Sequence, residues 1–127
     1  MASRYFQQFT SSLDRNVVIL DGTVTLNGAG APTALTGKGL STLVRTSTGV
    51  YTLTLMDRYY AFLYANASFN GVTGKAGLSD LTMGITSNVN NATPTVTFTF
   101  VNDAGTVTDP ASGVGLQFII LLKNTFL

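Results

Sequence analysis

The segment TVTFTFV, residues 95–101, alternates between threonine and an apolar residue over its first six positions. Because successive side chains of a strand point to opposite faces, Val96, Phe98 and Phe100 share one face and the threonines share the other. Threonine is β-branched and suits the solvated face of a sheet. The segment therefore predicts a strand with an inward apolar face and an outward hydroxyl face.

The same period of two recurs along the chain, between clusters of glycine, asparagine, aspartate and proline that are typical of turns. No segment predicts a helix longer than one turn. Short strands at near-regular spacing indicate an all-β fold, here an antiparallel β-sandwich or jelly-roll-like single domain over residues 17–127. Strands are expected within residues 17–26, 33–35, 40–45, 50–56, 57–69, 81–85, 95–101 and 114–124.

Four of these segments carry a more detailed expectation. Residues 40–45 and 50–56 predict a hairpin in which Gly49 adopts a positive φ and Tyr51, Leu53 and Leu55 point inward. Gly22 interrupts the first strand and is interpreted as a bulge. Residues 57–69 predict a turn that leads into a strand, where every second residue is aromatic: Tyr60, Phe62 and Tyr64.

The last strand, VGLQFIILLKN, begins by alternating and then becomes apolar on both faces over residues 118–122. A strand of this kind is normally covered on both sides. A second sheet or a neighbouring subunit is therefore expected to cover it. Residues 1–16 lack such alternation and are interpreted as an extended N-terminal arm, whose spaced aromatics Tyr5, Phe6 and Phe9 favour contact with another surface.

The composition excludes several classes of function. The chain has no cysteine and no histidine, which excludes thiolate metal sites and histidine-assisted serine catalysis. The seven lysines and arginines are scattered and the net charge is +1, so nucleic acid is not an expected partner. No apolar run is long enough to span a membrane, and no aspartate pattern or glycine loop has the spacing of a catalytic or phosphate-binding motif. No catalytic residue, metal ligand or cofactor is predicted, and the protein is expected not to be an enzyme.

Only 10% of residues are charged, against about 25% in ordinary soluble domains. A surface so poor in charge suits a protein that packs against others. The candidates for such contacts are Arg58, Tyr59 and Tyr60, because arginine and tyrosine are enriched at protein interfaces, and core positions for these aromatics are left open. An aromatic platform for a sugar, formed by Tyr59, Tyr60 and Tyr64, is the alternative.

Four segments, in this order, carry a resemblance to a family: RYFQQFTSSLDRN, VVILDGTVTL, GKGLSTLVRTSTGVYTLTLMDRYYAFLYA and DPASGVGLQFIILLKN. The chain resembles small virion structural proteins of tailed bacteriophages, of the capsid decoration or cement type. The resemblance implies a β-domain on the capsid surface of the virion, made in the host cytoplasm. Its partners would be the major capsid protein and further copies of itself, with a trimer as one arrangement.

The resemblance also suggests roles for residues. Arg4, Tyr5, Phe6 and Phe9 would contact the capsid or a neighbouring copy. Contacts with an oligomer or another partner would come from Arg58, Tyr59, Tyr60, Ile119 and Leu121. The mechanism would be reinforcement of the shell by many simultaneous modest contacts. A competing function is host recognition or carbohydrate binding on a tail or fibre.

Overall fold

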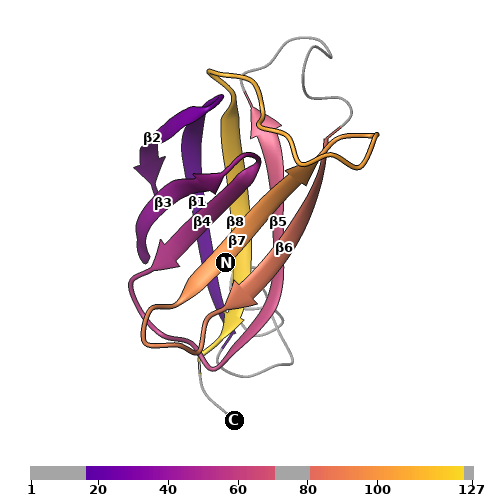
Figure 1. Ribbon diagram of the computed structural model, residues 1–127. Coiled ribbons are helices and arrows are strands. Elements are labelled where there is room, and N and C mark those ends of the chain that lie inside the picture. The colour runs from indigo at the N-terminus through magenta and orange to yellow at the C-terminus, as the bar shows by residue number, and fades with distance from the viewer. Residues whose placement is uncertain (1–16, 71–80, 125–127) are drawn as a thin grey trace, which may run out of the picture.

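The computed structural model describes residues 17–70 and 81–124 (Figure 1). The described chain is all-β, and its strands form two four-stranded antiparallel sheets. Sheet A has the strand order β2-β1-β8-β5 and sheet B the order β3-β4-β7-β6. Figure 1 shows the two sheets as stacked layers whose strands cross at an angle, which is the arrangement of a β-sandwich. The strands are β1 Val17–Asn27, β2 Gly30–Thr36, β3 Leu40–Ser47, β4 Val50–Leu55, β5 Ala61–Asn70, β6 Thr82–Asn88, β7 Thr95–Val101 and β8 Gly115–Lys123.

The core lies between the sheets and follows the alternation of the sequence. In β7 the side chains of Val96, Phe98 and Phe100 are buried, as predicted. Phe98 packs on Phe118 of β8 with ring centroids 5.7 Å apart, and Phe69 of β5 packs on Phe100 at 5.6 Å. Both aromatic pairs join sheet A to sheet B, so the inner faces of the two sheets form one core.

The predicted hairpin is confirmed in β3 and β4. Gly49 has a φ of 69°, and Tyr51, Leu53 and Leu55 are buried on the inner face of sheet B. A Cβ atom on Gly49 would lie 2.6 Å from a methyl carbon of Val107 and 2.8 Å from the backbone nitrogen of Thr108. Glycine is therefore required here both by the turn and by the loop that packs against it.

The prediction of a bulge at Gly22 is wrong. The pairing of β1 with β8 runs without a shift from Val17 to Thr25, and Gly22 lies opposite Phe118. The irregularity is in the neighbouring strand β2, where Ala34 has a φ of 58° and the β1–β2 register shifts. Gly22 instead marks a close approach, because its missing side chain leaves room for Leu40 of sheet B and for the ring of Phe118.

A bulge in β5 changes the expected facing of the aromatic residues there. Phe62 pairs with Leu122, but Tyr64 pairs with Leu121, so β5 has one extra residue between them. One extra residue reverses the facing of every residue after it. Phe62 consequently packs against the core, whereas Tyr64 is 52% exposed on the outer face of sheet A.

The close approach at Gly22 can be tested by adding one methyl group. A Cβ at this position would lie 2.6 Å from Cδ1 of Leu40 and 2.8 Å from both the Phe118 ring and the Thr36 carbonyl oxygen. We expect Gly22→Ala to lower the free energy of unfolding by about 1–3 kcal/mol, measured by urea denaturation.

The matched control is Gly84→Ala in β6, where the nearest atom to a new Cβ is 4.0 Å away. We expect this control to leave stability unchanged or slightly raised, because alanine restricts the unfolded chain more than glycine does. Equal stability of the two variants would contradict the close approach.

Candidate functional site

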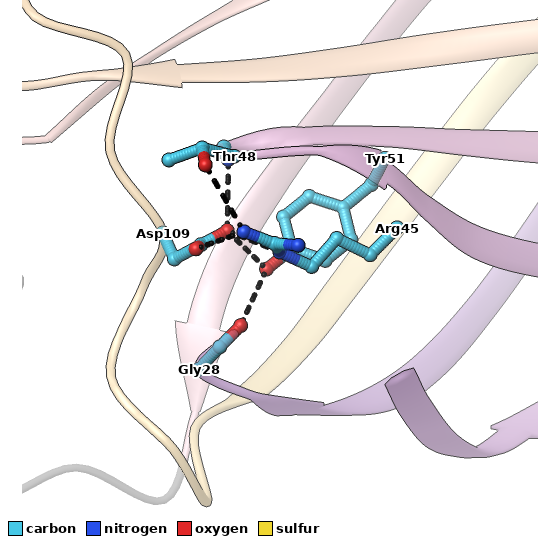
Figure 2. A network of polar contacts seen from close by, with 6 residues as sticks. Gly28, Arg45, Thr48, Tyr51 and Asp109 are labelled. Atoms are coloured by element: carbon cyan, nitrogen blue, oxygen red, sulfur yellow. Dashed lines mark hydrogen bonds and ion pairs between the residues drawn. The ribbon is translucent and has the colours of Figure 1, made fainter. Parts of the chain in front are cut away.

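One network of polar contacts among the described residues centres on the carboxylate of Asp109, at one end of the sandwich (Figure 2). Asp109 lies in the segment between β7 and β8, and it faces Arg45 of β3, 64 residues away in the sequence. Arg45 Nε donates to Asp109 Oδ1 at 2.9 Å, and Nη2 donates to Oδ2 at 2.7 Å. Two parallel bonds of this kind combine charge with geometric specificity.

Two further hydrogen-bond donors, besides Arg45, lie close to Asp109 Oδ1. The backbone nitrogen of Gly49 donates to it at 2.8 Å, and the hydroxyl of Tyr51 lies 3.2 Å from it. The same hydroxyl lies 3.3 Å from the carbonyl oxygen of Gly28, in the β1–β2 turn. The carboxylate thus joins the β3–β4 hairpin to the β7–β8 segment, and the Tyr51 hydroxyl, whose one proton is donated to either Asp109 or Gly28, brings the β1–β2 turn alongside.

The pKa values of these groups follow from the contacts. The hydrogen bond from Arg45 holds the pKa of Asp109 below its usual range, and the Gly49 amide acts in the same direction. Burial, followed by the negative charge of Asp109, raises the pKa of Tyr51 to about 12. Asp109 is therefore ionised at neutral pH with both oxygens occupied by donors, an arrangement suited to holding neighbouring segments together rather than to accepting a proton.

This network was not predicted from the sequence. Asp109 lies in a segment whose composition is typical of turns, and Arg45 is one of the seven scattered lysines and arginines. A signal was present, because Arg45 has the same parity in β3 as the buried Leu43. A cation at an inward position favours an anionic partner, although the alternation alone does not indicate which aspartate supplies it.

The second candidate is a surface, the outer face of sheet A. The register places Ile19, Leu121 and Tyr64 side by side across β1, β8 and β5. We call these three residues the apolar row. Ile19 is 60% exposed, and Ile119, two residues before Leu121 on the same face, is 39% exposed.

The two faces of the last strand, both predicted to be covered, differ in the structure. Sheet B covers the inner face of β8, where Leu116, Phe118, Ile120 and Leu122 are buried. The outer face carries Ile119 and Leu121, and Ile119 remains exposed within the described part of the chain. Of the five residues predicted as oligomer or partner contacts, these two therefore lie on the apolar face that the described strands leave open.

The other predicted contact residues are distributed differently. Arg58 and Tyr60 are exposed in the turn before β5, but Tyr59 is only 7% exposed and belongs to the core. The platform of Tyr59, Tyr60 and Tyr64 is therefore not formed, because Tyr59 is covered by the chain's own side chains. Arg4, Tyr5, Phe6 and Phe9 lie outside the described residues.

Neither a metal centre nor a membrane helix is found in the described ranges. Residues 17–70 and 81–124 contain no group of three or more potential metal ligands. The same ranges contain no helix of the length and hydropathy needed to cross a bilayer.

Comparison with protein families, with characterised proteins and with solved structures gave no match. The resemblance to phage virion proteins thus rests on the sequence segments alone.

The depressed pKa of Asp109 predicts a pH dependence of stability. Since the folded-state pKa lies below that of the unfolded chain, the contribution is complete above about pH 4 and is lost as the pH falls through the folded-state value. We expect Asp109→Asn to lower the Tm near neutral pH, with a difference from the natural protein that disappears in strong acid. Thermal melts followed by circular dichroism between pH 2 and 8 measure this.

Asp103→Asn is the control, because Asp103 is an exposed aspartate in the same segment. Its melting curves should follow those of the natural protein throughout. A constant difference between Asp109→Asn and the natural protein at every pH would contradict the role given to the Asp109 charge.

Proposed function

We propose that this protein is a non-enzymatic structural protein of a virion, of the capsid decoration type, which works by binding other proteins through its surfaces. The observation that carries the proposal is the apolar row of Ile19, Leu121 and Tyr64, together with Ile119, on the outer face of sheet A. Contiguous exposed apolar residues on a folded domain are typical of protein contact sites.

The contrast with sheet B supports this interpretation. Its outer face is built largely from hydroxyl residues, such as Thr52 and Thr54 of β4 and Thr97 and Thr99 of β7. Threonine is what the sequence places at the solvated positions of a sheet. Apolar residues at outward positions are therefore a feature of sheet A in particular, and the chain does not place them on both outer faces alike.

The assignment to a capsid rests on the resemblance described above and on the low charge of the chain. Only 10% of the residues are charged, so long-range repulsion between closely packed copies is weak. A rigid domain that occupies many equivalent positions on a shell gains strength from the number of its contacts rather than from the affinity of each. Pressure from packaged DNA would be opposed in this way.

The proposal predicts binding to capsid shells that lack this protein. We expect the full chain to co-sediment with shells of the major capsid protein and to raise their resistance to heat or osmotic shock. Absence of binding by the full chain would contradict the proposed function.

The arm is tested in the same assay. Deletion of residues 2–13, which removes Arg4, Tyr5, Phe6 and Phe9, should abolish co-sedimentation while the melting curve of the domain is retained. Retained binding would contradict the role of the arm without affecting the proposal that the protein binds shells. The substitution Val44→Ser, at an exposed position of β3, serves as the control that should bind normally.

A second candidate function is carbohydrate binding for host recognition. A shallow depression of about 230 Å³ opens on the outer face of sheet A, and Asn66, Ser68 and Gln117 contribute polar groups to its lining. Exposed Tyr64 is two residues from Asn66 on the same face. Amides beside an exposed aromatic ring suit a sugar, and loss of glycan-array binding in Gln117→Ala would support this function over capsid decoration.

A further inference from the structure

We propose that the outer face of sheet A binds a second copy of this chain, in a two-fold dimer centred on the apolar row. The row consists of Ile19, Leu121 and Tyr64 on three adjacent strands. Two such faces would pack as a pair of aligned sheets, each supplying its apolar row to the centre of the contact. The inference concerns the same face as the proposed function, but it does not require capsid binding.

The rows on either side of the apolar row carry opposite charges. On one side, Lys123 of β8 lies between Val17 and Ala61. On the other side, Asp21 of β1 lies next to Ile119 of β8. The face therefore has a cation at one end, an apolar centre and an anion beyond it.

This order of charges selects one orientation of the two-fold axis. A two-fold axis that lies between the two facing sheets and runs perpendicular to the strands places β8 over β8 of the second copy. The two β8 strands then run in opposite directions. Lys123 then faces the row that contains Asp21 of the other copy, and Leu121 faces its own counterpart. An axis parallel to the strands would instead place Lys123 against Lys123, which like-charge repulsion disfavours.

Dimerisation by strand pairing along the β5 edge of sheet A is disfavoured. β5 is an edge strand, but its bulge between Phe62 and Tyr64 interrupts the regular backbone pattern. The backbone nitrogen of Ala67 in this strand already donates to the side chain of Asn66 at 2.9 Å. Bulges and occupied backbone groups are features that hinder edge-to-edge pairing.

The first test uses the isolated protein in sedimentation velocity experiments. We expect a concentration-dependent dimer whose dissociation constant rises about tenfold or more in Ile119→Ser, because this residue lies beside the centre of the contact. Val44→Ser is the matched control, since Val44 is 51% exposed on the outer face of sheet B. Melting curves verify that both variants fold.

The second test exchanges the charges. Asp21→Lys and Lys123→Asp should each weaken the dimer, because each places like charges in facing rows of the two copies, one strand apart. The double variant should restore it, because the pairing is recovered with the signs reversed. Failure of the double variant to restore association, while it folds normally, would overturn the orientation.

The third test uses the absence of cysteine from the chain. Leu121→Cys introduces one thiol close to the two-fold axis, so a short bis-maleimide reagent, which spans the roughly 10 Å between facing sheets, should cross-link the dimer. Val44→Cys should not cross-link under the same conditions. The inference would be overturned by a natural protein that is monomeric at every concentration, or by a dimer lost on deletion of residues 2–13 but unaffected by Ile119→Ser.

These outcomes are separate from the proposed function, because capsid shells are absent from all three experiments. A dimer without shell binding would support this inference and contradict capsid decoration. A monomer that binds shells would support capsid decoration and contradict the dimer.

Discussion

The contact between the apolar inner faces of the two sheets is the interaction on which the structure depends. The chain has no cysteine for a disulfide, and within the described residues no cluster could hold a metal ion. Burial of apolar side chains therefore supplies the main stabilisation. Phe98 against Phe118 and Phe69 against Phe100 join the sheets. The separation of the sheets is small enough at Gly22 that a single Cβ would not fit without a shift.

This packing is completed at one end of the sandwich by a polar network. Asp109 there receives hydrogen bonds from Arg45 and from the backbone of Gly49, and Tyr51 lies within reach of the same carboxylate. Arg45 lies on the inward side of β3 but keeps 21% of its side chain exposed, and the carboxylate satisfies two donors of its fork. The network holds the loop between β7 and β8 against the β3–β4 hairpin.

The same sheet architecture leaves apolar residues exposed on the outer face of sheet A. β8 is apolar on both faces, but sheet B covers only its inner face. Ile119 and Leu121 are therefore left outside, where Ile19 and Tyr64 extend the apolar area. Because the core does not need these residues, their presence on the surface is better explained by a partner than by folding. Capsid binding, sugar binding and self-association are the alternatives proposed for this face.

The strands themselves could be predicted from the sequence, because the period of two is a local property that each strand retains in any sandwich. The β3–β4 hairpin, the positive φ of Gly49 and the inward set Val96, Phe98 and Phe100 follow from it. The face of Tyr64 and the burial of Tyr59 could not be predicted, because a one-residue bulge and a turn reverse or redirect the pattern. The partnership of Arg45 with Asp109 required the tertiary structure, since folding alone brings together residues 64 positions apart. Sequence thus determined the elements and their apolar faces, whereas register and packing decided which side chains meet and which remain exposed.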